Sequence, residues 1–182
     1  MEGNIPDKLE LYLKDLEGRY KYYYDVERNK EISGIKIDIF AQSITKHYRN
    51  ILIKKIRLDQ FYTKEYAIVK TLKGFGDKRE VEEFSQFLVS SIKELITPSV
   101  DTMCTIINGV LISTSSFSEE AIKFGEKFKF SKSFLLGIKG WCDIRLILVD
   151  WKVQKLFSNQ KGKEVICAYK IKSSLGGDRI KE

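Results

Sequence analysis

The stretch Gly109-Val-Leu-Ile-Ser-Thr-Ser-Ser-Phe-Ser-Glu-Glu-Ala-Ile-Lys-Phe-Gly-Glu-Lys-Phe128 decides the fold, because it predicts a buried strand, a hydroxyl-rich turn and a capped helix in succession. Residues 110–112 form an apolar run of strand type, which apolar residues extend upstream to Cys104. Ser118 is placed to cap the helix, and the two glutamates after it favour the first turn through the helix dipole. Apolar residues then recur at helical spacing and share one face: Ala121, Phe124 or Gly125, and Phe128.

This strand, turn and helix resemble the corresponding unit of the Mrr-like branch of the restriction-endonuclease-like, PD-(D/E)xK superfamily. In that branch an apolar strand runs into Thr-Ser-x-Phe-Ser and a helix that opens with Glu-Ala, which residues 114–118 and 120–121 match. The resemblance covers about twenty residues and includes no catalytic group, so it implies a fold and leaves the function open.

The rest of the chain predicts further helices and strands around this unit. A helix is expected from about Asn4 to Glu17, with Gly18 as its stop, and a second one after a cap at Asp77, ending before Pro98. Turns are expected at residues 28–30 and 159–162. Strands are expected at residues 20–26, 34–41, 50–57, 65–72, 131–138, 141–150, 152–157 and 164–172.

This order predicts one α/β domain with a mixed sheet flanked by helices. The resemblance implies a core of αβββαβαβ order, which the chain follows with an extra early strand and a C-terminal β-extension. We expect the restriction-endonuclease-like core at residues 1–138, a β-rich extension of the same domain at 139–172, and a flexible tail at 173–182.

Composition excludes several classes of protein. With 43% hydrophobic and 12% aromatic residues, the chain is globular, and it has no apolar run near the roughly 20 residues that span a bilayer. Its beginning lacks the basic and apolar regions of a signal peptide. Three widely spaced cysteines form no metal pattern and predict buried thiols in a reducing cytoplasm. Abundant Lys, Glu and Ile with two prolines are compatible with a thermophilic source.

The net charge of +7 is concentrated in two basic blocks. Residues 44–64 carry a net charge of +5 and residues 127–172 carry +8, whereas residues 65–126 carry −4. If the blocks meet in space, they make a surface for DNA or RNA; the alternative is a solvated Lys-rich surface that keeps the protein in solution. The candidate nucleic-acid-binding residues are Lys46, Arg49, Lys54, Lys55, Arg57, Lys132 and Lys139.

The resemblance also implies a metal site. Nucleases of this fold carry an acidic residue on one strand and Glu/Gln-x-Lys on the next, and the acidic groups hold a divalent cation. Asp38 interrupts an apolar strand, so it matches the first acid, although it would equally face solvent or pair with Lys36. The second half is broken, because an apolar residue stands two before every candidate lysine.

The candidate catalytic cluster is therefore Asp38, Glu65 and Lys70, with Asp38 and Glu65 as metal ligands for Mg²⁺ if the protein is an enzyme. Glu65 and Lys70 are five residues apart, so they point to opposite faces of an unbulged strand. Glu10 or Glu17 would supplement the cluster. The single histidine, His47, has no serine or cysteine partner that would indicate nucleophilic catalysis.

Two aromatic segments add alternatives. The tyrosines of residues 20–24 either stack on bases or cover the edge of the core. The strand Trp141–Trp151 is either central or an interface, and Asp143 and Arg145 are expected to pair on one of its faces.

We favour a nucleic-acid-associated protein that has a nuclease-like fold and a degenerate or remodelled active site. The first alternative is a Mg²⁺-dependent deoxyribonuclease that uses Asp38, Glu65 and Lys70. The second is a non-enzymatic interaction domain that self-associates through the Trp141–Trp151 strand or the C-terminal hairpin. No membrane partner is expected.

Overall fold

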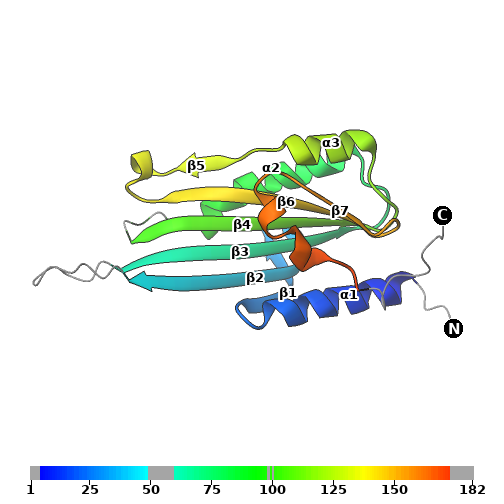
Figure 1. The fold of residues 1–182 in the computed structure, drawn as a ribbon, viewed down its shortest axis with the longest axis horizontal. Helices are drawn as coiled ribbons and strands as arrows, with labels where there is room; N and C mark the ends of the chain where they lie inside the picture. Colours follow the sequence, from blue (N-terminus) through cyan, green and yellow to red (C-terminus); the bar gives the residue numbers. More distant parts are fainter. Residues whose placement is uncertain (1–4, 49–59, 98, 100, 173–182) are drawn as a thin grey trace, which may run out of the picture.

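The computed structural model describes residues 5–48, 60–97, 99 and 101–172, which form three layers of helix, sheet and helix (Figure 1). In chain order the elements are α1 (Ile5–Tyr20), β1 (Asp25–Ile32), β2 (Ile35–Tyr48), β3 (Gln60–Leu72), α2 (Lys78–Leu95), β4 (Thr102–Ser113), α3 (Glu119–Lys127), β5 (Ser131–Ser133), the 3₁₀ turn η1 (Leu135–Gly137), β6 (Trp141–Asp150), β7 (Lys155–Ser158), and the 3₁₀ turns η2 (Gly162–Glu164) and η3 (Ile166–Tyr169).

The strands form one seven-stranded mixed sheet. Its order is β1-β2-β3-β4-β6-β5, and β7 pairs with β6 farther along the same edge. The strands β1, β2 and β3 are antiparallel neighbours, while β3, β4 and β6 are parallel to one another. The parallel pairs need crossovers, which α2 and α3 supply. The expected fold class, an α/β domain with a mixed sheet flanked by helices, is confirmed.

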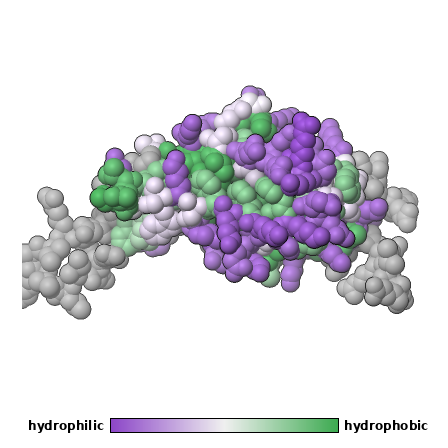
Figure 2. Space-filling view, turned by 90° about the horizontal axis from the view of Figure 1, so that it is seen from above, coloured by the Kyte–Doolittle hydropathy of each residue, from purple (hydrophilic) through white to green (hydrophobic). Residues whose placement is uncertain are grey.

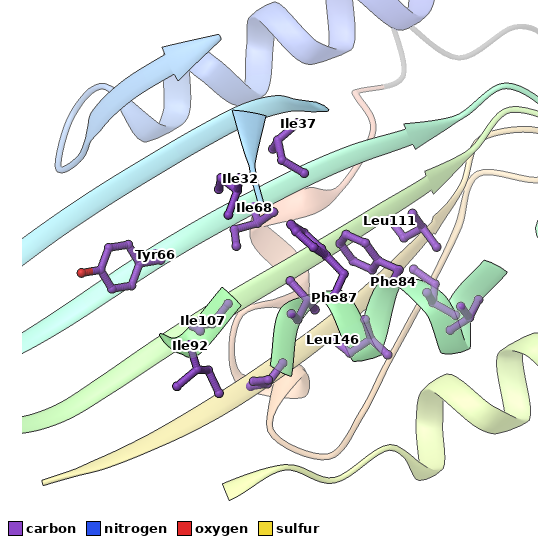
Figure 3. Close-up of a cluster of buried hydrophobic side chains, with 14 of the residues drawn as sticks. Ile32, Ile37, Tyr66, Ile68, Phe84, Phe87, Ile92, Ile107, Leu111 and Leu146 are labelled. Carbon is purple, nitrogen blue, oxygen red and sulfur yellow. The ribbon is translucent and has the colours of Figure 1, made fainter. Parts of the chain in front are cut away.

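One face of the sheet packs against α2 and α3. Alternate residues of the central strands point to this side, among them Ile68, Leu111 and Leu146, and they contact the apolar stripe of α2. Figure 3 shows Phe84 and Phe87 of α2 among these sheet residues. The helices begin where the sequence predicts, because Asp77 accepts a hydrogen bond from the Glu80 amide at 2.9 Å and Ser118 accepts one from Ala121 at 3.1 Å.

The other face packs against α1 and η3. The residues between those that face α2, such as Val69, Val110 and Ile147, form a second core with Tyr12 and Leu16 of α1. Both faces of β4 and β6 are therefore apolar over their covered length, as expected for parallel strands between two helical layers.

The first helix is longer than predicted. It continues through Gly18 to Tyr20, so the expected strand at residues 20–26 is wrong and β1 begins at Asp25. Tyr12, Leu16 and Tyr20 recur every four residues on the buried side of α1, and burying Tyr20 offsets the roughly 1 kcal/mol cost of an exposed helical glycine.

The first hairpin turn also lies elsewhere. Residues 28–30 belong to β1, and the chain turns at Ser33 and Gly34, which have φ values of 49° and 77°. Ile32 pairs directly with Ile35, so two residues with positive φ close the hairpin as a primed turn does. Glycine tolerates this conformation without strain, which explains its place in the turn.

The predicted C-terminal strand at residues 164–172 is wrong. Tyr169 of η3 is buried and the partly buried Val165 and Ile166 pack into the same core, where the Tyr169 carbonyl accepts a hydrogen bond from the Tyr12 hydroxyl at 2.6 Å. Asn159 does not sit in an exposed hairpin turn, because its buried amide bonds the backbone of Ile144, Leu146 and Gly162.

Two further expectations change. Of residues 131–138, only Ser131–Ser133 are extended, and η1 follows. The predicted strand at residues 50–57 and the expected tail at 173–182 both lie wholly outside the described residues.

Candidate nucleic-acid interface

Asp38, the expected first acid, lies half-buried in β2. Its Oδ2 accepts a hydrogen bond from the Thr71 amide on β3 at 2.6 Å. The carboxylate therefore bridges two strands, and it does not form the alternative pair with Lys36 among the described salt bridges.

Glu65 belongs to a polar network on the α1 side of the sheet. Its Oε1 accepts hydrogen bonds from Asn108 Nδ2 at 2.7 Å and from Arg145 Nη1 at 3.3 Å. Arg145 also donates to Glu164 at 2.5 Å, so one guanidinium joins β6, β3 and η2. Burial and the neighbouring Glu65 carboxylate raise the pKa of Tyr24 above its usual range. The network leaves Asn108 Oδ1 buried without a hydrogen-bond partner in the described part of the chain.

Lys70 lies on the opposite face of β3. It lines a small cavity of about 70 Å³ on the α2 side, together with Glu80 and Glu83. Ala67 and Val69 point to the α1 face, as Glu65 does, and the register of β3 is regular against β4 between Glu65 and Lys70. The structure therefore does not bring Glu65 and Lys70 together. Within the described ranges, no group of three His, Cys, Asp or Glu residues is placed to hold a metal ion.

The two glutamates of α1 that were expected to supplement the cluster are engaged in ion pairs. Glu10 pairs with Arg28 at 2.9 Å, and Glu17 pairs with Lys21 at 2.7 Å. The nearby guanidinium and ammonium groups hold the pKa of Glu17 below its usual value, with the Lys21 hydrogen bond as the first cause. Both carboxylates therefore support the packing of α1.

The expected pair between Asp143 and Arg145 is wrong. Asp143 pairs with Lys161 at 2.5 Å, while Arg145 contacts Glu65 and Glu164. The two residues share a face but are about 7 Å apart along the strand, which leaves cross-strand partners closer to each charge.

The described basic candidates gather at one end of the sheet. Lys46 lies near the end of β2, Lys132 lies in β5, and Lys139 precedes β6. Figure 1 shows these segments at the end opposite to the chain termini. Lys132 also lines a cavity of about 520 Å³ with Val89 and Lys93 of α2. Arg49, Lys54, Lys55 and Arg57 lie outside the described residues.

The sheet register connects the two basic blocks. Lys132 pairs with Cys142, Cys142 with Thr105, and Thr105 with Lys64, so one row crosses four strands. Paired residues share a face, and neighbouring strands lie about 4.8 Å apart, so Lys132 and Lys64 are separated by roughly 14 Å on the α2 side. We call Lys46, Lys64, Lys132 and Lys139 the basic end.

Lys64 was missed as a binding residue from the sequence. The signal was present, because strand alternation places Lys64 on the same face as Tyr62 and Tyr66. The covered part of this face stops near Tyr66, whose hydroxyl donates to the Leu95 carbonyl at the end of α2 at 3.0 Å. Beyond that point the face of β2 and β3 has no described helix over it.

Aromatic rings accompany the lysines of the basic end. Lys46 Nζ lies 5.9 Å from the Tyr62 ring centroid, and Lys132 Nζ lies 5.5 Å from that of Phe134. On the other face, His47 stacks on Phe61 with centroids 5.6 Å apart and lies 3.2 Å from the Thr63 hydroxyl. The described contacts of His47 are therefore an aromatic ring and a threonine hydroxyl.

Part of the tyrosine run covers the core, as one alternative expected, and the base-stacking alternative stays a prediction. Tyr20 is buried against Tyr169 and Tyr24 is half-buried, whereas Tyr22 and Tyr23 are exposed with ring centroids 6.5 Å apart. Trp151 is buried against Tyr12.

The cysteines are free, and Cys104 and Cys142 are buried as expected, while Cys167 is exposed on η3. Burial raises the pKa of the Cys142 thiol to about 12, so it stays protonated near neutral pH. The described helices include none that is long and apolar enough to cross a bilayer.

Comparison with known proteins identifies a family. Residues 8–171 match the family described as "Domain of unknown function (DUF8052)", which covers most of the chain. The chain therefore belongs to this family. No curated protein matches the sequence.

A solved structure described as a repair endonuclease from Pyrococcus abyssi aligns with 17% identity and a TM-score of 0.35. The alignment covers 68% of this chain and 43% of that one, so the present chain spans less than half of that protein. This degree of similarity carries no argument about the function.

Proposed function

We propose that this DUF8052 protein binds nucleic acid through the basic end, and that it descends from Mrr-like nucleases whose metal site has been lost or remodelled. The observation that carries the proposal is the register row that joins Lys132 and Lys64 across four strands. Two sequence-distant basic blocks meet there on one face, which is the electrostatic footprint that phosphate backbones select.

Charge and aromatic side chains both support this assignment. None of Lys64, Lys132 and Lys139 takes part in the described salt bridges, so in the described part their charges remain available to a polyanion. Rings beside Lys46 and Lys132 offer stacking surfaces of the kind that tolerate any base. Free thiols are compatible with a cytoplasmic location, which is part of the proposal.

Binding is favoured over cleavage by the positions of the nuclease candidates. Glu65 is held by Arg145 and Asn108 on one face, and Lys70 lies on the other. A lysine has to approach the attacking water and the scissile phosphate beside the metal, which a position across the sheet does not allow.

The test is fluorescence anisotropy of labelled duplex and single-stranded DNA and RNA with the full chain at about 50 mM salt, followed by a salt titration. We expect binding that weakens steeply with salt. The triple variant Lys46→Glu, Lys64→Glu, Lys132→Glu should bind at least about tenfold more weakly, because phosphate contacts are lost. Each lost contact should also lower the slope of log affinity against log salt concentration by roughly 1.

A matched control is available at the opposite end of the sheet. Lys152→Glu with Lys155→Glu changes exposed lysines near β7 and should leave the affinity within about twofold, after allowance for its smaller charge change. Equal losses in both variants would indicate only an effect of net charge and would contradict the proposal. No binding by the wild-type chain at low salt would also contradict it.

Cleavage is tested in the same samples. Supercoiled DNA is incubated with Mg²⁺ or Mn²⁺ and the wild-type chain or Asp38→Ala. We expect no nicking by either protein. Metal-dependent nicking that Asp38→Ala abolishes would overturn the degenerate-site part of the proposal and restore the nuclease alternative.

A further inference from the structure

The connection between β5 and β6 exposes three large apolar side chains next to each other. Leu135, Leu136 and Ile138 have 63%, 99% and 63% of their surfaces exposed. Trp141, the first residue of β6, is also 39% exposed. Figure 2 shows a hydrophobic cluster near the end of the molecule opposite to the termini. We call Leu135, Leu136 and Ile138 the apolar tip.

The backbone holds the apolar tip in a defined and strained conformation. Leu135 and Leu136 have φ values of 48° and 53°, a left-handed region that non-glycine residues enter at a cost of about 1 kcal/mol or more each. Five short-range hydrogen bonds between residues 134 and 140 close the loop, including Phe134 N to Gly140 O at 2.9 Å and Lys139 N to Phe134 O at 3.1 Å. The strained backbone costs free energy of folding and leaves both leucine side chains in water, so the conformation does not stabilise the fold.

Gly140 anchors the tip to the sheet. A Cβ at this position would lie 2.2 Å from the Thr102 carbonyl oxygen, and the φ of 79° is in the left-handed region. The chain therefore presses directly against the start of β4 at the base of the tip. This contact fixes the direction in which the apolar tip projects.

The surroundings of the tip are cationic. The segment 127–142 contains four lysines and no acidic residue. Lys129, Lys132 and Lys139 are exposed, and none of them belongs to a described salt bridge. A symmetric contact between the tips of two copies would bring these like charges together, so charge complementarity favours an anionic occupant.

The shape of the tip selects among anionic occupants. It carries three apolar side chains, and the part-exposed Trp141 follows at the start of β6. A step between two base pairs accepts a single inserted apolar side chain. The interface of a bilayer accepts several apolar side chains, with tryptophan at the headgroup level and lysines beside the lipid phosphates.

We propose that the apolar tip inserts into the surface of an anionic lipid bilayer, while Lys132 and Lys139 contact the lipid headgroups. Such an attachment requires no membrane-spanning helix, so it is compatible with described helices that are too short or too polar to cross a bilayer. It revises the expectation that the protein has no membrane partner. It goes beyond nucleic-acid binding, because it uses the apolar residues that the basic end leaves unexplained.

The test is cosedimentation of the full chain with phosphatidylcholine vesicles that contain about one third phosphatidylserine, compared with pure phosphatidylcholine. We expect binding to the anionic vesicles and much weaker binding to the neutral ones. Leu136→Asp should lower the partition coefficient about tenfold or more, because one full leucine burial is lost. The double variant Lys132→Glu, Lys139→Glu should lower it by a similar factor.

Val153→Asp is the matched control, since Val153 is 51% exposed in the β6–β7 turn at the other end of the sheet. It should bind vesicles as the wild-type chain does. Aspartate tolerates positive φ, so Leu136→Asp should keep the wild-type urea midpoint, which is measured alongside.

Three outcomes would overturn the proposal. The first is no binding to anionic vesicles at about 50 mM salt. The second is equal partition of Leu136→Asp and Val153→Asp. The third is an unchanged vesicle partition of Leu136→Asp together with a loss of another interaction. Loss of self-association in sedimentation velocity would assign the tip to a second copy, and loss of DNA affinity would assign it to nucleic acid. No nucleic acid is present in the vesicle assay, so its failure is distinct from failure of the proposed function.

Discussion

At the end of the sheet where β4 and β6 finish, buried polar groups hold connecting loops in place, whereas the opposite end leaves charged groups available. Asp150 is 2% exposed and accepts hydrogen bonds from Ser116 Oγ at 3.1 Å, Phe117 N at 3.2 Å and Val153 N at 3.1 Å. Ser113 Oγ lies 2.7 Å from both the Gly74 and the Ser116 carbonyl oxygens, which share its single proton. Among the described hydrogen bonds and salt bridges, none forms a comparable network around the side chains of Lys132 or Lys139. The buried polar groups at the covered end therefore stabilise the fold, whereas Lys132 and Lys139 of the basic end are exposed to solvent and accessible to partners.

Asp150→Ala should have the largest effect on the covered end. The substitution leaves the Phe117 and Val153 amides and the Ser116 hydroxyl without their acceptor, so we expect the free energy of unfolding to fall by about 3 kcal/mol. Urea denaturation followed by circular dichroism measures it. Asp25→Ala, an exposed aspartate at the start of β1, is the control and should change stability by less than about 0.5 kcal/mol. Similar losses in both variants would remove the contrast between the ends.

The tyrosine cluster that attaches η3 to α1 predicts alkaline sensitivity. Burial raises the pKa of Tyr169 from 10.0 to about 12, and the Tyr20 hydroxyl donates to it at 2.9 Å. The folded state disfavours the Tyr169 phenolate relative to the unfolded state. The contribution of the protonated Tyr169 to the free energy of unfolding is therefore complete below pH 10 and is lost as the pH rises from 10 to about 12. We expect a loss of about 2 kcal/mol across that window.

Urea titrations at several pH values in this window measure the slope. Tyr169→Phe removes the titrating hydroxyl, so its stability should fall less steeply with pH than that of the wild-type chain. An identical dependence of stability on pH in both proteins would mean that ionisation of Tyr169 does not weaken the contact between η3 and α1.

Arg145 joins β6 to β3 and η2 through Glu65 and Glu164. Arg145→Ala should lower the free energy of unfolding by about 1.5 kcal/mol, because it leaves the half-buried Glu65 carboxylate with Asn108 but without its cation. The additional variant Glu65→Gln should recover part of the loss, since the amide needs no counter-charge. Denaturation of the single and double variants measures the coupling. Additive losses would show that the network is not a unit.

Lys64→Glu should have the smallest effect on folding and a clear effect on binding. Lys64 forms no described salt bridge, so we expect a change in stability below about 0.5 kcal/mol. DNA affinity should fall several-fold in the anisotropy assay, because one phosphate contact becomes a repulsion. A large loss of stability would place Lys64 with the residues that hold the fold together and would weaken the contrast.

Local signals predicted the elements whose partners are near in sequence. The caps at Asp77 and Ser118, the stripe of α2 and the apolar run of β4 follow from periodicity and from side chains three residues away. The extension of α1 to Tyr20 and the 3₁₀ turns around Tyr169 were missed. Their residues are ordered by contacts with each other across about 150 positions of the chain, which no local window contains.

The sequence by itself determined an α/β chain with two basic blocks and three widely spaced cysteines, because composition and spacing are properties of single segments. Only the tertiary structure decided that Lys64 and Lys132 share a row, that Glu65 faces away from Lys70, and that Leu136 is exposed. Strand order and register set these relations, and they depend on pairings between segments whose positions relative to each other are fixed only when the whole sheet forms.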